Sequence, residues 1–270
     1  MTAMAPGTPR QRALVTGASN GIGLELARVL AREGWDLVMT ARNQETLAQL
    51  ASELSSSHHV SVHVVAADLA SPDGAHLLMQ DIASAGLAVD ALVNNAGFGL
   101  FGPFATTPLD RERHMIDLNI TALVTLTKLC LPAMLQRRRG RVLNVASTAA
   151  FLPGPNMSVY YATKAFVLSF SEAIGDELRG TGVTVTTLCP GPTETAFQGV
   201  ARMQTSRLVK GAMMSAADVA AAGYRGMIAG QAVIIPGATN RLVPLIVRML
   251  PRRLSTIVSR RAAEAESRQG

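Results

Sequence analysis

Cysteine is scarce in this 270-residue chain, which has only Cys130 and Cys189. Both lie in apolar contexts, and neither belongs to a CxxC pair or to a run with the spacing of metal ligands. This excludes a disulfide framework and argues against a zinc site. We therefore predict that the protein binds no metal and works in the reducing cytoplasm.

Aromatic residues are also few, at 4% of the chain. Nucleic acid would be a natural partner for a net charge of +6, but no motif for stacking on bases is present. The charge is also confined to one end: residues 241–270 hold seven arginines against two glutamates, and the rest is close to neutral. We expect no nucleic-acid partner.

Long apolar runs are missing as well. The N-terminal stretch MTAMAPGTPRQRALVTG lacks the apolar core of a signal peptide, and no apolar run approaches the length of a membrane span. We expect a disordered tail over residues 1–11, one oxidoreductase domain over 12–239, and a basic, apolar extension over 240–270.

Short apolar runs alternate with helix-like segments throughout residues 12–239. Such continuous apolar strands are typical of a parallel sheet covered on both faces. The pattern predicts an α/β fold, a doubly wound parallel sheet (Rossmann fold) of about seven strands with helices on both faces. The runs are ALVTGAS (13–19), DLVMTAR (36–42), VSVHVVAADL (60–69), DALVNNAG (90–97), RVLNVAS (141–147), VTVTTLCPG (183–191) and AVIIPG (232–237).

A glycine-rich turn, TGASNGIG, follows the first run and opens a helix at about Gly21. Gly17, Gly21 and Gly23 there permit a tight turn and a close approach of the backbone to a pyrophosphate at the positive end of the helix. The second run ends in Arg42, where a carboxylate would favour NAD and an arginine favours the 2′-phosphate of NADP. We predict NADP(H) over NAD(H).

The segment YYATK places Tyr160 and Tyr161 ahead of Lys164. In a helix the lysine can meet either tyrosine, because both three- and four-residue spacings share a face. Local geometry leaves the choice open.

Taken together, the motifs resemble the short-chain dehydrogenase/reductase family in its short single-domain form, over roughly residues 12–237. They occur in the family's order: TGASNGIG, NNAG, Asn119 in DLNITA, Ser147 in NVASTAA, YYATK and CPGPTET. The family motif, a tyrosine four residues before a lysine and a serine on the preceding strand end, matches Tyr160 and leaves Tyr161 to pack or to line the substrate cleft.

The resemblance implies a catalytic set of Ser147, Tyr160, Lys164 and Asn119. It also implies cofactor contacts along the cleft. Members that bind NADP often carry a basic residue where this chain has Asn20, so the cofactor prediction depends on Arg42. The implied cofactor-binding residues are Gly17, Ser19, Asn20, Gly21, Ile22, Gly23, Arg42, Asp68, Leu69, Asn95, Tyr160, Lys164, Pro190, Gly191, Thr193 and Thr195.

The chemistry requires these groups, because hydride transfer to a carbonyl leaves negative charge on oxygen. Tyr160 would donate a proton there, but a free tyrosine has a pKa of about 10. A lysine ammonium about 4 Å away would lower that pKa by at most about three units, and Lys164 would also position the cofactor. Ser147 would donate a hydrogen bond to the oxygen. By resemblance, Asn119 supports a water linking the lysine to solvent.

The substrate side is apolar and carries few charges. We expect a small or lipid-like ketone or alcohol in a pocket of Phe98, Leu100, Phe101, Phe104, Leu152 and Met157, with residues 195–215 as a lid. The alternative is a cofactor-binding regulatory or scaffold protein with little turnover, which the intact Ser147, Tyr160 and Lys164 disfavour. A sugar-nucleotide epimerase would need a larger C-terminal domain.

The tail NRLVPLIVRMLPRRLSTIVSRR, residues 240–261, is apolar with arginines at Arg241, Arg248 and Arg252 on one helical face, and Pro244 and Pro251 should divide it into short helices. Two roles remain open: peripheral contact with an anionic membrane, or packing on the body or a second subunit. By resemblance the protein should form a homo-oligomer.

Overall fold

The computed structural model describes residues 10–195, 213–249 and 251–263. Most of the tail expected at residues 1–11, most of the lid expected at 195–215 and the last residues of the C-terminal extension lie outside these ranges.

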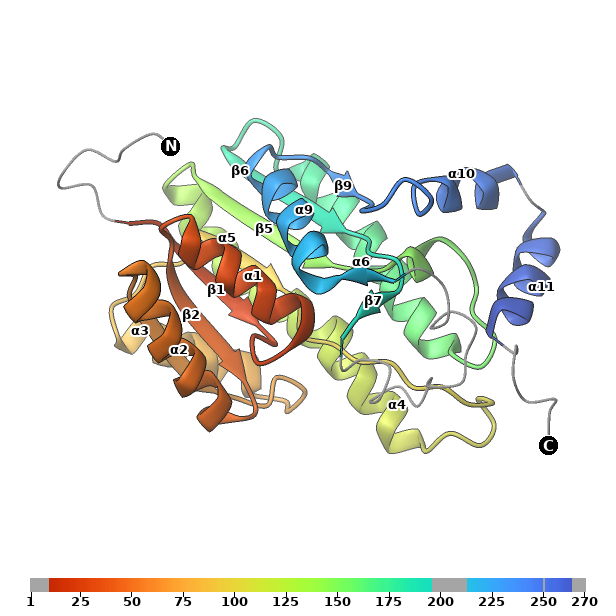
Figure 1. Ribbon diagram of the computed structural model, residues 1–270, viewed down its shortest axis with the longest axis horizontal. Helices are drawn as coiled ribbons and strands as arrows, with labels where there is room; N and C mark the ends of the chain where they lie inside the picture. The colour runs from red at the N-terminus through yellow and green to blue at the C-terminus, as the bar shows by residue number, and fades with distance from the viewer. Residues whose placement is uncertain (1–9, 196–212, 250, 264–270) are drawn as a thin grey trace.

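A seven-stranded parallel sheet forms the centre of the molecule, in the order β3-β2-β1-β4-β5-β6-β9 (Figure 1). All seven strands coincide with the predicted apolar runs. The order reverses between β1 and β4, and ligands of open α/β sheets bind outside the carboxyl ends of the strands at such a reversal. The predicted doubly wound Rossmann fold is therefore confirmed. The strands are β1 (Arg12–Thr16), β2 (Asp36–Ala41), β3 (Val62–Ala66), β4 (Ala91–Asn94), β5 (Gly140–Val145), β6 (Val183–Leu188) and β9 (Val233–Ile234).

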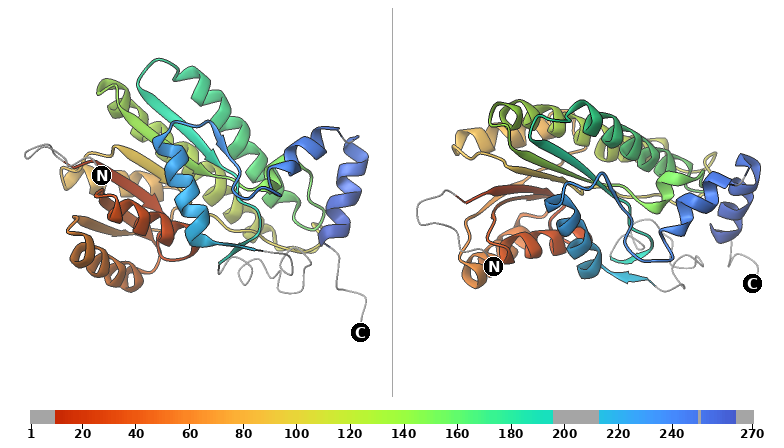
Figure 2. Two further views of the ribbon diagram at one scale, coloured as in Figure 1. Left: turned by 45° about the horizontal axis from the view of Figure 1, so that its top comes forward. Right: turned by 90° about the horizontal axis from the view of Figure 1, so that it is seen from above.

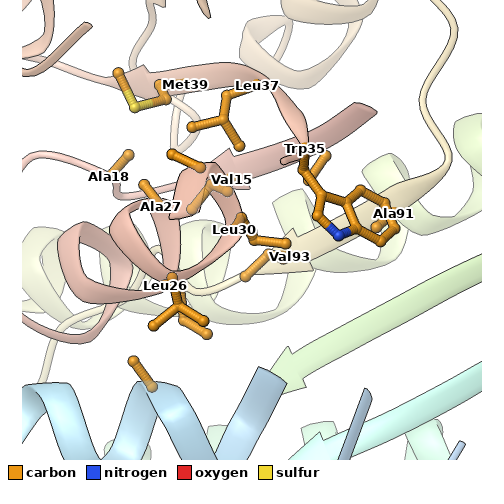
Figure 3. Close-up of a cluster of buried hydrophobic side chains, with 14 of the residues drawn as sticks. Val15, Ala18, Leu26, Ala27, Leu30, Trp35, Leu37, Met39, Ala91 and Val93 are labelled. Atoms are coloured by element: carbon orange, nitrogen blue, oxygen red, sulfur yellow. The ribbon is translucent and has the colours of Figure 1, made fainter. Parts of the chain in front are cut away.

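Helices cover both faces of the sheet, as Figure 2 shows from above. One core cluster joins the sheet to α1 (Gly21–Arg32), α2 (Gln44–His58) and α9 (Ala216–Ile228). The labelled side chains of Figure 3 lie in this cluster, where Leu30 of α1 lies beside Val93 of the sheet and Leu26 lies between α1 and α9. The opposite face is covered by α3 (Gly74–Ser84), α5 (Ala122–Gln136) and α6 (Ser158–Glu177).

One helix is long and apolar enough to be compared with a membrane span. α4 (Leu109–Ile116), the π-helical turn η1 (Asp117–Thr121) and α5 run on without a break over Leu109–Gln136, 28 residues with a window of mean hydropathy 1.6. By length and composition this helix could cross a membrane. A core helix passes the same test, and α5 places Leu126, Cys130 and Met134 in the second core cluster.

Two short features flank the carboxyl edge of the sheet. The 3₁₀ turn η2 (Thr148–Phe151) follows β5, and a separate two-stranded sheet pairs β7 (Thr193–Glu194) with β8 (Met214–Ser215). The sequence predicted neither, because η2, β7 and β8 lie outside the apolar runs and are too short to carry a periodic pattern.

The C-terminal segment forms two helices, α10 (Leu242–Met249) and α11 (Arg252–Ala263), at the end of the molecule away from α2 and α3 (Figure 1). Pro251 separates them as predicted, but Pro244 lies within the first turn of α10, where proline is tolerated. Arg241 precedes α10, Arg248 lies within it and Arg252 begins α11. The expectation that these three arginines share one helical face is therefore wrong.

Candidate active site

A cavity of about 610 Å³ opens at the carboxyl edge of the sheet. Residues at or just beyond the carboxyl ends of β1 to β6 line it, so segments far apart in the sequence meet at the reversal of strand order. Of the predicted catalytic and cofactor-binding residues, only Gly23 and Asn119 are not among its lining. Those that do line it are Gly17, Ser19, Asn20, Gly21, Ile22, Arg42, Asp68, Leu69, Asn95, Ser147, Tyr160, Lys164, Pro190, Gly191, Thr193 and Thr195.

The glycines of the glycine-rich turn have little room for a side chain. Gly17 has a φ of +65° and a Cβ there would lie 2.9 Å from Asn95 Nδ2. That amide donates to the carbonyl oxygens of Thr16 and Gly17, at 2.9 and 3.2 Å, and so fixes the turn against the loop after β4. Gly23 lies beneath the turn, where a Cβ would overlap with Asn95 and the Gly17 carbonyl. Its role is packing, which explains its absence from the lining.

The first turn of α1 fits the phosphates of a dinucleotide. Asn20 precedes the helix without capping it through its side chain, and the first turn holds no acidic residue. The N–H groups at this positive helix end thus lack a side-chain cap beside the cavity, as binding of an anion requires. Gly21, with a φ of +55°, lies against Thr195, so the loop after β6 closes over the same turn.

The rim after β2 contains two polar residues that the sequence reading missed. Asn43 and Thr46 line the cavity beside Arg42. The side chain of Asn43 caps α2 by accepting a hydrogen bond from the Thr46 N–H at 3.0 Å. An asparagine directly before a helical run is a recognisable capping signal that would have identified Asn43.

Tyr160 and Ser147 meet on the other side of the cavity. Tyr160 is 8% exposed, and burial raises its pKa, while a hydrogen bond with Ser147 acts in the opposite direction. The Ser147 hydroxyl also accepts from the Ala149 N–H at 3.1 Å, so it caps η2 as well. In the protein alone, burial therefore dominates the pKa of Tyr160, opposite to the lowering expected from Lys164.

Lys164 is buried below Tyr160. Its ammonium lies 5.8 Å from the centre of the Tyr160 ring and donates to the carbonyl oxygen of Val145 at 2.8 Å. Desolvation lowers its pKa to about 8, and the neighbouring Cys189 opposes this slightly. Because this pKa lies near neutral pH, a nearby charge can change the protonation of Lys164, whereas an exposed lysine stays protonated.

Asn119 lies in the π-helical turn and is buried. Its side chain accepts from the Phe98 N–H at 3.1 Å and donates to the Phe98 carbonyl and the Thr163 hydroxyl, each at 3.0 Å. π-Helical turns are frequent at functional sites. The amide thus joins the loop after β4 to the helix that carries Tyr160 and Lys164.

Tyr161 also lines the cavity, on the substrate side. Its ring packs on Gly154, where a Cβ would overlap with the ring. Burial raises the pKa of Tyr161, and an interaction with Ser259 of α11 lowers it. Ser259 is buried, yet it has no short, well-directed hydrogen bond in the described part of the chain, so this interaction is weak. α11 therefore packs on the body beside the cavity.

The apolar pocket predicted for the substrate is corrected by the structure. Of its six residues only Phe98 and Met157 line the cavity. Phe104 is 64% exposed and Leu100 is buried in a core cluster. Arg111 and His114 of α4 line this end instead. Nothing in the sequence marked these two residues, since an arginine and a histidine on a polar helix face are usually exposed to solvent.

A doubly wound parallel sheet with a cavity at its reversal of strand order is the architecture of the dinucleotide-binding oxidoreductases. A family model described as short chain dehydrogenase matches residues 11–206, and the chain belongs to this family. Its relatives and structural neighbours include proteins named as reductases and dehydrogenases.

Three similar proteins illustrate the relationship. A very-long-chain 3-oxoacyl-CoA reductase of Aspergillus clavatus is 38% identical over 175 residues, 64% of this chain and 51% of the relative. Sulfoacetaldehyde reductase 2 of Chromohalobacter salexigens is 39% identical over 186 residues, 68% of this chain and 73% of the relative. A short-chain dehydrogenase from Sphingobium yanoikuyae, solved with NADPH, has a TM-score of 0.78 and 31% identity, covering 96% of this chain and 100% of that one. The match to the 3-oxoacyl-CoA reductase thus spans about half of that relative.

Proposed function

We propose that the protein transfers a hydride between NADP(H) and the carbonyl or alcohol carbon of an apolar substrate. The observation that carries the proposal is the meeting of Ser147, Tyr160 and Lys164 at the substrate side of the cavity. The named relatives, a 3-oxoacyl-CoA reductase and a sulfoacetaldehyde reductase, support carbonyl chemistry.

The cofactor would lie along the cavity, with its phosphates at Ser19–Ile22 and Arg42 and its nicotinamide near Pro190–Thr195. When bound, it supplies or accepts the hydride and, once oxidised, adds positive charge. Arg42, with Asn43 beside it, can hold a 2′-phosphate through its fork of N–H groups. The NADPH-bound neighbour is consistent with this preference.

Tyr160 acts as the acid in the reducing direction. Its phenol O–H donates to the carbonyl oxygen of the substrate, and its proton moves to that oxygen as negative charge develops. Ser147 donates a second hydrogen bond to the same atom, which stabilises the charge and orients the carbonyl. Both side chains are anchored, Ser147 at the start of η2 and Tyr160 in the first turn of α6.

Lys164 supports Tyr160 electrostatically. Burial alone would make the phenol a poor acid, because it disfavours phenolate. The Lys164 ammonium acts against that effect in a site of low dielectric, where its charge interacts more strongly than in water. Asn119 keeps Thr163 and the Phe98 loop in place around the pair.

The decisive measurement is oxidation of NADPH, and then of NADH, against aliphatic, aromatic and lipid ketones. We expect Tyr160→Phe to fold and bind cofactor but to lose at least about 100-fold in kcat, the usual contribution of a general acid. Tyr161→Phe should keep kcat within about tenfold, since it removes no proton donor from the reaction. Near-normal turnover by Tyr160→Phe would refute the assignment, and cofactor binding without turnover would favour a regulatory protein.

Further parts of the proposal concern partners and location. Two free, buried cysteines support the reducing cytoplasm. Phe166, 39% exposed and stacked on Phe170, supports a homo-oligomer that buries this face of α6. Light scattering on the purified chain would measure its mass.

α10 supports peripheral contact with an anionic membrane. It buries no side chain, and its apolar residues recur at helical spacing on the surface. Leu245 is 62% and Met249 85% exposed, with Leu242 and Ile246 beside them. α10 lies against η2, whose Thr148 and Ala149 line the cavity. A lipid-like substrate would thus reach the site from the membrane side.

A further inference from the structure

We propose that Arg111, seated on the Phe98 ring at the substrate end of the cavity, binds an anionic group of the substrate. The inference rests on the proposed function and narrows its substrate class. The substrate would be an apolar ketone or alcohol that also carries a carboxylate, sulfonate or phosphate.

The first support is the charge of the cavity wall. Asp68 is the single acidic residue among the described residues that line the cavity, and it lies beyond β3, at the adenosine end. The substrate end has cationic or titratable nitrogen groups instead, at Arg111, His114 and Lys164. Because Lys164 is buried beneath Tyr160, Arg111 is the permanent cation that a substrate meets at this end.

The second support is the lack of an internal counter-ion. Some other arginines of the described chain are paired with a carboxylate, for example Arg28 with Glu25 at 2.9 Å and Arg139 with Asp90 at 3.2 Å, while others, such as the exposed Arg113, are not. Arg111 has no carboxylate within 4.0 Å among the described residues. Its neighbour Glu112 is turned into the protein, 7% exposed, and accepts a hydrogen bond from Thr107 at 2.7 Å.

The third support is the contact between the Arg111 guanidinium and the ring of Phe98. Its carbon lies 4.9 Å from the centre of the Phe98 ring, within the range of a cation–π contact. A guanidinium above a ring face can still direct N–H groups to a ligand, and these form the fork that binds oxyanions in pairs.

Phe98, which carries the Arg111 contact, is connected by hydrogen bonds to the helix that holds Tyr160 and Lys164. Both backbone polar groups of Phe98 are held by Asn119, which also bonds Thr163, the residue before Lys164. The Phe98 ring packs in the same cluster as Met157 and Tyr160. Arg111 is therefore separated from Tyr160, the proton donor, by the apolar side chains of this cluster. This is the position expected of a residue that binds the end of the substrate away from the reacting carbonyl.

The test compares matched substrates with and without the charge. 3-, 4- and 5-Oxohexanoate and their methyl esters would be assayed with NADPH against the native protein, Arg111→Gln, Arg111→Lys and Arg113→Gln. Arg113 is the control, since it lies two residues away on α4 but does not line the cavity. Dissociation constants for NADPH would be measured on every variant.

We expect the native protein to favour at least one acid over its ester about tenfold or more in kcat/KM, the value of one charge-assisted contact. Arg111→Gln should abolish that preference by raising KM for the acid, with kcat for the ester and the affinity for NADPH unchanged. Arg111→Lys should retain part of it, and Arg113→Gln all of it.

Equal kcat/KM for acid and ester with the native protein would overturn the inference about Arg111. Turnover of the esters would still uphold the proposed function. A matching loss in Arg113→Gln would assign the effect to general surface charge, and weaker NADPH binding in Arg111→Gln would assign the residue to the cofactor. Both results refute the proposal. Binding of the acids and esters to the NADPH-loaded Tyr160→Phe variant gives the same comparison without turnover, and equal or absent binding of both likewise contradicts it.

Discussion

Two features require glycine at position 17: a backbone in the left-handed region and a neighbouring side chain that leaves no room for a Cβ. Gly34 shares only the first, since its φ is +82° but nothing lies within 4 Å of a Cβ built there. An alanine at either position costs on the order of 1 kcal/mol of backbone strain. At Gly17 the new methyl group would also press on the Asn95 amide that holds the turn.

We therefore predict that Gly17→Ala weakens NADPH and NADH alike by about tenfold or more, and lowers the free energy of unfolding more than Gly34→Ala does. Urea denaturation and fluorescence titration of the cofactor measure the two effects. Equal losses of stability, with cofactor binding intact, would show that the turn can absorb a side chain.

Lys164 predicts a dependence of stability on pH. Its pKa is about 8 in the folded protein, below the value of about 10.4 expected when unfolded. Between these values the unfolded chain binds more protons, so this residue makes the folded state more stable as pH rises from about 8 to 10. Below pH 8 the cost of burying the ammonium is present in full.

The variant Lys164→Met removes this titration. The difference in unfolding free energy, native minus variant, should therefore rise between pH 7 and pH 10, by at most about 3 kcal/mol. Urea unfolding at a series of pH values gives this difference, in which the titrations of all other groups largely cancel. A difference that is flat or falls with pH would mean that the lysine is not desolvated as described.

At the scale of elements, local signals in the sequence predicted the fold well. The seven strands were visible because parallel strands covered on both faces are apolar throughout, and α1 because a glycine-rich turn precedes it. The π-helical turn at Asn119 was not visible, since no composition distinguishes it from the α-helix on either side. It depends on tertiary bonds from Asn119 to Phe98 and Thr163, and those partners come from distant segments.

The same limit explains the errors in the substrate pocket. Whether Leu100 or Phe104 faces a cavity depends on the path of the loop 98–108, which hydrophobicity alone does not set. Arg111 was missed for a related reason: its position on Phe98 joins two elements, and neither residue is unusual in its own sequence context.

α10 allows a prediction for an isolated element. Leu245→Ser with Ile246→Ser should weaken binding to vesicles containing phosphatidylserine about tenfold or more, because each side chain contributes about 1.5–3 kcal/mol when fully buried in an apolar phase. Leu77→Ser is the matched control, as Leu77 is 60% exposed but lies on α3. Co-sedimentation with the vesicles at low and high salt measures binding. High salt should also weaken binding by the native protein, because it screens the attraction between the arginines and the anionic lipid.

Absent binding by the native protein, or an equal loss in the α3 control, would contradict membrane contact. The exposed face of α10 would then be left for a second subunit, the other role that the sequence had kept open for this segment.

At the scale of the whole molecule, the cavity links both halves of the fold. Its lining runs from Gly17 to Thr195 and crosses the reversal of strand order between β1 and β4. A ligand there contacts segments of both halves, which also meet through the sheet and through the packing of α1 on α9. Cofactor binding should therefore stabilise the protein as a unit, and the size of that effect reports affinity.

We predict that NADPH at 100 times its dissociation constant stabilises the native fold by about 2.7 kcal/mol, and that the same concentration stabilises Arg42→Ala by about 1.4 kcal/mol or less if affinity falls tenfold. NADH, which has no 2′-phosphate for Arg42 to bind, should stabilise both proteins equally. Thermal unfolding followed by circular dichroism measures these shifts, at about 2–4 °C per kcal/mol. An equal loss with NADH would mean that Arg42 supports the rim in general, and the preference for NADP would then have to come from Asn43, Thr46 or the helix end behind them.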